Sequence, residues 1–93
     1  MLPIGISVKV LNSIVDELRK RGLWAERHSY SIRIMYNGEF VASLHIYPGF
    51  NEAVLRLYGS EESNKIVLSC VKELFTKYLV NYSIKVTYIS RSQ

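Results

Sequence analysis

The sequence contains few of the residues that build disulfide frameworks or rigid loops. It has one cysteine and two prolines among 93 residues. A single cysteine excludes an internal disulfide, and a small domain without disulfides is typical of a reducing compartment. No apolar run approaches the roughly 18–20 residues of a membrane span, and residues 1–5 do not resemble a signal peptide. These features predict a cytoplasmic protein with no membrane association.

Reactive side chains are also scarce. The histidines and the cysteine are His28, His45 and Cys70. Strand periodicity places the two histidines on opposite faces, whereas Cys70 belongs to an apolar helical stripe, where a thiol is a poor nucleophile. A metal site needs several converging ligands, and the five isolated glycines form no phosphate-binding loop. The sequence therefore predicts no metal, no cofactor, no small-molecule substrate and no enzyme activity.

The composition is that of a folded, basic domain. Hydrophobic residues make up 48% of the chain and charged residues 22%, which predicts one globular domain over residues 1–93. The formal net charge is +4 and the pI is near 9.3. This charge favours anionic partners such as nucleic acid or an acidic surface.

Two segments have apolar residues at helical spacing. The first helix is expected from about Ser7 to Arg21, with Ser7 as N-cap and Gly22 as stop signal. The second is expected to follow Gly59-Ser60 and to end near Asn81. Its apolar stripe consists of Ile66, Val67, Cys70, Val71, Leu74, Phe75, Tyr78 and Leu79.

Between the helices, and after the second one, the apolar residues alternate with period two, which predicts strands. One long first strand is expected from Leu23 to Met35, with Trp24, Glu26 and His28 on the core side. The other strands are expected over about Glu39–Tyr47, Glu52–Tyr58 and Tyr82–Ile89, and Ser90–Gln93 are expected to fray.

Asn37-Gly38 marks the turn between the first two strands. A one-residue slip of register moves every side chain to the other face, so burial should decide the pairing. Pairing Ile34 with Phe40, and Ile32 with Ala42, keeps the apolar residues together. This pairing predicts a three-residue loop with Gly38 in the left-handed region.

The predicted fold is an α+β two-layer sandwich in the order α-β-β-β-α-β, with a mostly antiparallel four-stranded sheet. The strand–helix–strand connection at the end is expected to be a right-handed crossover. It would lay the last strand parallel to the third and, most simply, beside the first. Both helices would then cover one face of the sheet and leave the outer face uncovered.

The predicted outer face carries cations and aromatic rings, while its acids, Glu39 and Glu52, lie at strand ends. Strand parity assigns to it Arg27, Ser29, Ser31, Arg33, Val41, Ser43, His45, Tyr47, Val54, Arg56, Tyr58, Ser83, Lys85 and Thr87.

Guanidinium and ammonium groups contact phosphates, and aromatic rings stack on bases. The sequence therefore predicts a small non-enzymatic protein that binds DNA or RNA. Two alternatives remain open: a solvated sheet face without a ligand, and a homodimeric structural or protein-interaction module that uses the outer face or an edge strand. The basic run Arg19–Arg21 would support binding only if it lay beside the outer face. The residues expected to bind are Arg27, Arg33, His45, Tyr47, Arg56, Tyr58 and Lys85.

Overall fold

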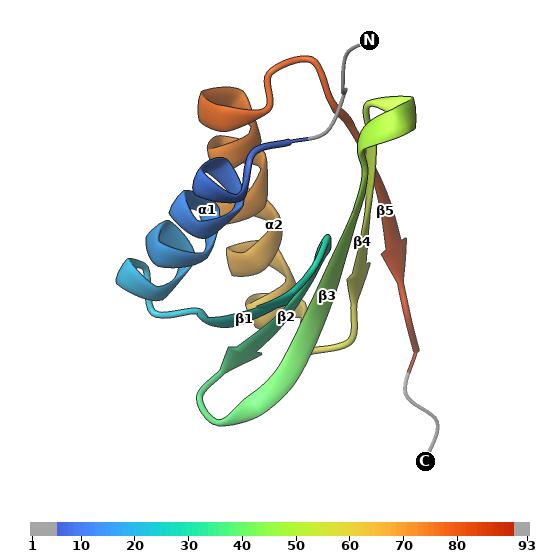
Figure 1. Ribbon diagram of the computed structural model, residues 1–93. Helices are drawn as coiled ribbons and strands as arrows, with labels where there is room; N and C mark the ends of the chain where they lie inside the picture. Colours follow the sequence, from blue (N-terminus) through green and yellow to red (C-terminus); the bar gives the residue numbers. More distant parts are fainter. Residues whose placement is uncertain (1–5, 91–93) are drawn as a thin grey trace, which may run out of the picture.

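The computed structural model describes residues 6–90, which form two helices and a five-stranded sheet (Figure 1). In chain order the elements are α1 (Val8–Lys20), β1 (Trp24–His28), β2 (Ser31–Tyr36), β3 (Glu39–Tyr47), the short 3-10 helix η1 (Pro48–Phe50), β4 (Glu52–Leu57), α2 (Glu61–Tyr78) and β5 (Ser83–Tyr88).

Both helices begin at serine caps. In α1 the hydroxyl of Ser7 accepts a hydrogen bond from the backbone N–H of Val10, and in α2 the hydroxyl of Ser60 accepts one from Ser63. Gly22 follows α1 with a φ of 86°, as its role as a stop signal requires. Most of each apolar stripe is buried, while Ile66, Cys70 and Tyr78 of α2 are only partly buried. The two predicted helices are confirmed.

The two helices lie side by side on the same face of the sheet (Figure 1). The strand order is β1-β2-β3-β4-β5; β1 to β4 are antiparallel neighbours, and β5 is parallel to β4. The predicted α+β class, with both helices on one face, is confirmed. The sheet nevertheless has five strands and is mixed, whereas four were expected.

The expected first strand is a hairpin of two strands. It turns at Ser29-Tyr30, where Ser29 has a φ of 57°, and His28 pairs with Ser31. The turn reverses the parity of β1: Ala25 is buried, whereas Trp24 is 51% exposed. The prediction that Trp24, Glu26 and His28 face the core is therefore wrong, because Ser-Tyr lacks the glycine, asparagine or aspartate that usually marks a two-residue hairpin turn.

The register between β2 and β3 also differs from the prediction. Asn37 and Gly38 both have positive φ and form a two-residue turn that pairs Tyr36 with Glu39. A bulge at Val41 then shifts the pairing, so Ile34 meets Ala42 instead of Phe40. Burial does select the register, as expected, and Gly38 is left-handed; the extra residue lies in the strand instead of the loop.

The last strand is parallel to β4, as predicted, but it lies beside β4 and not beside the first strand. The crossover through α2 therefore joins neighbouring strands. This arrangement leaves β1 and β5 as the two edges of the sheet.

Within residues 6–90 no helix is long and apolar enough to cross a membrane. The segment without a signal-peptide pattern, residues 1–5, lies outside the described residues. So do residues 91–93 of the tail that was expected to fray.

Candidate functional site

The face of the sheet opposite the helices, here called the open face, is not covered by any element of residues 6–90 (Figure 1). The observed register assigns to it Trp24, Glu26 and His28 from β1; Ser31, Arg33 and Met35 from β2; Phe40, Ser43, His45 and Tyr47 from β3; Glu52, Val54 and Arg56 from β4, with Tyr58 just after it; and Ser83, Lys85 and Thr87 from β5.

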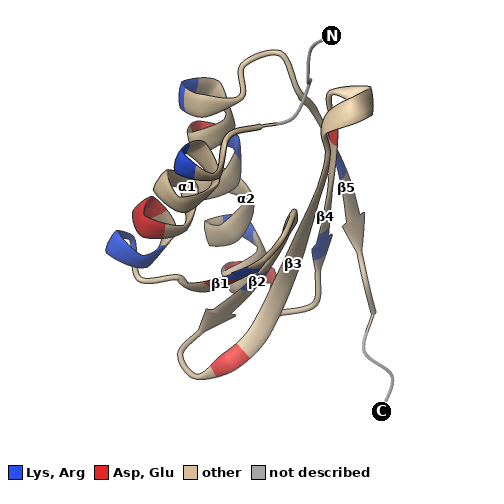
Figure 2. Cartoon of the chain, in the orientation of Figure 1, with Lys and Arg blue, Asp and Glu red and all other residues tan. Residues whose placement is uncertain are grey.

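Three cations of the predicted site lie on this face. Arg33 and Arg56 flank Ser43 in one cross-strand row, since Ser43 pairs with both. They are two strands apart, a separation of about 10 Å. Lys85 lies on the next strand and pairs with Val54. Basic positions thus recur on β2, β4 and β5 across the sheet (Figure 2).

An aromatic pair adjoins Arg33. The ring centroids of Phe40 and Tyr58 are 4.9 Å apart, and the Arg33 guanidinium lies 5.4 Å from the Phe40 centroid. Phe40 lies on the open face, and the bulge at Val41 takes up the parity change within β3. The sequence prediction missed Phe40, and the signal available for it was Asn37-Gly38, which favours a two-residue turn.

His45 and Tyr47 form a second aromatic pair farther along β3, with centroids 4.5 Å apart. Ser31 Oγ lies 2.6 Å from His45 Nδ1. Nucleophilic catalysis would need a further group to orient the histidine and donors for an oxyanion. No carboxylate of residues 6–90 bonds His45. The contact with Ser31 holds one nitrogen of the His45 ring, which lies beside Tyr47.

Arg27, in contrast, does not lie on the open face. Its Nε donates to Asn12 Oδ1 of α1 (3.2 Å) and its Nη1 to the carbonyl of Ser29 (2.9 Å). Arg27 is placed on the helix side by the same hairpin that reverses the parity of β1. The structure thus brings together six of the seven predicted site residues and separates Arg27 from them.

The open face also carries two acids, Glu26 in the middle of β1 and Glu52 at the start of β4, as expected for Glu52. Glu26 pairs in register with Arg33, and its Oε2 accepts a hydrogen bond from Trp24 Nε1 (3.3 Å). Glu52 pairs with Tyr47. Among the described residues the open-face cations Arg33, Arg56 and Lys85 therefore face two acids, and the excess of positive charge is smaller than predicted.

One member of the basic run reaches the border of the open face. The Arg19 guanidinium lies 4.0 Å from the Trp24 ring centroid, and Arg19 Nε donates to the carbonyl of Ala25 (2.9 Å). Arg21 instead bonds Glu73 of α2. Arg19 thus meets the condition under which the basic run supports binding, while Arg21 does not.

Side chains whose pKa values differ from their ordinary values include Glu17 and Lys77 in the helix layer and Tyr82 just before β5. A hydrogen bond from Lys77 lowers the pKa of Glu17, and the same contact raises the pKa of Lys77. Burial raises the pKa of Tyr82. Three or more metal-ligating side chains do not cluster anywhere in residues 6–90.

Comparisons with protein-family models, curated proteins and solved structures found no match to this chain.

Proposed function

We propose that the protein binds single-stranded nucleic acid through the open face. The observation that carries this proposal is the presence of three cations and two pairs of aromatic rings on one uncovered sheet face. A strand with unstacked bases can lie across such a face, with phosphates beside the cations and bases on the rings. A base-paired duplex offers no unstacked base to those rings.

The cations are available for phosphate. Arg33, Arg56 and Lys85 take part in none of the ion pairs of residues 6–90, which all lie among α1, its C-cap Arg21 and α2. Arg33 and Lys85 are exposed, and Arg56 is partly buried. A phosphate would therefore not have to displace a protein carboxylate from any of the three.

The rings give the proposed face its preference for single strands. Phe40 and Tyr58 adjoin Arg33, whereas His45 and Tyr47 lie on the other side of the Arg33–Arg56 row along β3. Stacking of one base on one aromatic side chain contributes about 1–3 kcal/mol. Two stacking positions separated by a basic row would fit a segment of a few nucleotides.

The test is fluorescence anisotropy with labelled single- and double-stranded DNA and RNA. Affinity for the single strand should fall with a log–log salt slope of roughly −2, because each of three neutralised phosphates contributes about −0.7. The single strand should bind more tightly than the duplex. Absence of binding at low salt would overturn the proposal and leave the solvated-face alternative.

Reversing the charge of two open-face arginines tests whether the nucleic acid binds to this face. The double variant Arg33→Glu/Arg56→Glu should reduce affinity at least tenfold, since two phosphate contacts become repulsive. Its matched control is Lys9→Glu/Lys72→Glu, which changes the net charge equally but alters exposed lysines of α1 and α2. Equal losses in the two variants would show attraction to overall charge and contradict a site on the open face.

The rings are tested separately. Tyr58→Leu should weaken single-strand binding roughly 5- to 150-fold, by loss of about 1–3 kcal/mol of stacking, while the salt slope stays unchanged. A variant that alters the slope and not the affinity would contradict stacking at Tyr58.

A further inference from the structure

The two edges of the sheet differ in how far their backbone groups are satisfied. An edge strand presents a row of unpaired N–H and C=O groups that can pair with another chain, and proteins usually protect such edges. β1 is a short edge strand that contains Glu26 and Arg27. Arg19 Nε also donates to the carbonyl of Ala25 on its outer side. The β1 edge is thus protected.

The outer edge of β5 is less protected in the described part of the chain: Lys85 is its one charged residue, and no side chain of residues 6–90 bonds its outward backbone groups. The N–H of Ser83 donates to the carbonyl of Asn51, and that of Ile89 to the carbonyl of Leu57 (3.0 and 2.8 Å). In a parallel ladder every second residue bonds the neighbouring strand. The odd-numbered residues of β5 therefore bond β4, and the N–H and C=O groups of Ile84, Val86 and Tyr88 point outward.

The same three residues have side chains on the helix side that are only partly covered. They pair in register with Ala53, Leu55 and Leu57, all of them fully buried, yet Tyr88 itself is 63% exposed.

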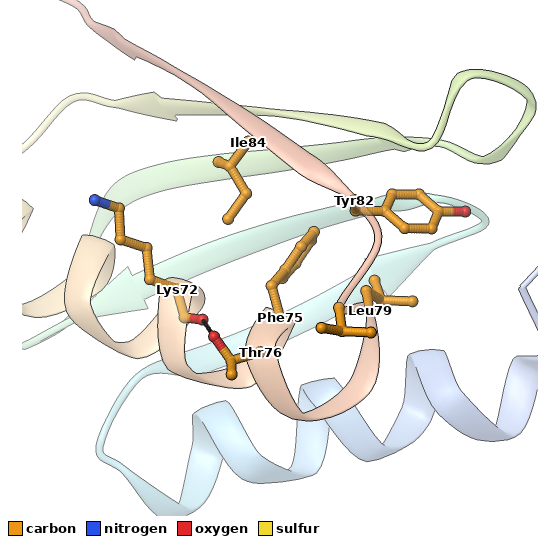
Figure 3. Close-up of a pocket in the computed structure, with 7 residues that line it drawn as sticks. Lys72, Phe75, Thr76, Leu79, Tyr82 and Ile84 are labelled. Carbon is orange, nitrogen blue, oxygen red and sulfur yellow. Dashed lines mark hydrogen bonds between the residues drawn. The ribbon is translucent and has the colours of Figure 1, made fainter.

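A groove of about 320 Å³ separates the end of α2 from the start of β5. In Figure 3 Ile84 points from β5 toward Phe75, and Leu79 and Tyr82 close the end of the groove. α2 therefore covers β5 incompletely.

We propose that a second copy of this chain pairs with β5 in antiparallel orientation, about a two-fold axis through Val86. Antiparallel partners must present their side chains on the same face. Two registers satisfy this condition around the middle of β5. An axis at Lys85 places Lys85 opposite the partner's Lys85, whereas the proposed axis at Val86 places Lys85 opposite the partner's Thr87.

Charge selects between the two registers. Like charges directly opposite each other are destabilising, and a pair of an aromatic and a β-branched residue is favourable. The second register avoids the lysine pair and sets Ile84 opposite the partner's Tyr88, beside the groove. It also places the outward groups of Val86 opposite those of the partner's Val86, where they can exchange two hydrogen bonds.

The resulting dimer has one continuous ten-stranded sheet with all four helices on one side. The open faces of the two copies become one surface, with Lys85 and the partner's Lys85 near its centre. The dimer does not depend on nucleic-acid binding, although it would double the length of any strand that the open face holds.

The test is sedimentation equilibrium without nucleic acid over a range of protein concentrations. The wild-type mass should rise from 10.7 kDa toward twice that value. Thr87→Lys should weaken the dimer roughly 2- to 30-fold, because it places a lysine opposite Lys85 at two symmetric positions. The double variant Lys85→Glu/Thr87→Lys should restore the dimer, because both pairs then become attractive.

Val86→Pro tests the backbone pairing. Proline removes the outward N–H of Val86 without removing a bond to β4, so the variant should stay folded by circular dichroism and become monomeric. A monomer at all concentrations, or a dimer unchanged by Thr87→Lys, would overturn the proposal. A dimer that persists in Arg33→Glu/Arg56→Glu while binding is lost would separate the two proposals.

Discussion

Gly59 joins β4 to α2 at the tightest contact of any described glycine. A Cβ at this position would overlap Ser63 Oγ and lie 3.1 Å from Val41 Cγ1. The Gly59 N–H also donates to Asn64 Oδ1 (3.1 Å), which holds the chain close to the first turn of α2. Gly59 does not have a positive φ, so backbone conformation does not require a glycine here. A glycine is required because a larger residue would collide with Val41 and Ser63.

Gly59→Ala is expected to lower the free energy of unfolding by about 1–3 kcal/mol, as forced overpacking does. Urea denaturation measures the change. Gly49→Ala is the control, because no atom lies within 4 Å of its added Cβ. Equal stability of the two variants would show that Val41 and Ser63 move aside without cost.

The bulge in β3 accommodates Val41 without changing which side chains lie on the open face. Val41 is the extra residue; it is buried under the start of α2, and its carbonyl accepts a hydrogen bond from the N–H of Tyr58 (2.8 Å). Without it the strand would alternate regularly, with Phe40 still on the open face and Ala42 still buried. The bulge therefore adds one buried side chain and a bend to β3. The residues on either side of it remain on the faces that regular alternation would give them.

Deletion of Val41 should leave a cooperatively folded protein that is about 1.5–3 kcal/mol less stable, the contribution of one buried valine. Deletion of Val54 from the regular strand β4 should abolish cooperative unfolding, since it moves Leu55 and Leu57 to the open face. Thermal denaturation followed by circular dichroism compares the two. Cooperative folding after loss of Val54 would contradict the register argument.

At the scale of the whole molecule, the charged groups divide into two sets. In the helix layer Glu17 of α1 accepts hydrogen bonds from Lys77 (3.0 Å) and Tyr78 (3.2 Å) of α2. On the open face the cations take part in no ion pair of residues 6–90. Two of the three ion pairs thus connect α1 or its C-cap to α2, and the cations on the other side of the sheet stay outside these pairs.

Because Glu17 interacts with Lys77 in the folded protein, the free energy of unfolding should depend on pH in the acidic range. Lys77 lowers the pKa of this carboxyl from its ordinary value of 4.5, so the folded state favours the ionised form. The stabilisation is present above pH 4.5 and is lost as the pH falls through the lowered pKa.

Glu17→Gln should therefore flatten the decline of unfolding free energy with pH in that acidic window. Denaturation at a series of pH values measures it, with Asp16→Asn as the control. Asp16 is an exposed neighbour without an ion pair in residues 6–90. The same pH profile in wild type and Glu17→Gln would contradict the role of the contact.

The sequence alone determined the features that depend on neighbours within a few residues. The serine caps, the apolar stripes of both helices and the two-residue period of the strands were all readable, because each follows from local backbone geometry. The parallel direction of β5 followed from the strand–helix–strand connection, because a helix returns the chain to the end of the sheet from which the third predicted strand starts. Six of the seven predicted site residues were assigned to the correct face for the same local reason.

Tertiary structure decided the features that depend on pairing between distant strands. The turn at Ser29-Tyr30, the bulge at Val41 and the position of β5 beside β4 have no strong local signal. Each is selected because it buries apolar side chains on the helix side, and burial sums over the whole sheet. That is why Arg27 and Trp24 exchanged faces, and why the position of β5 at an edge of the sheet could not be read from the sequence.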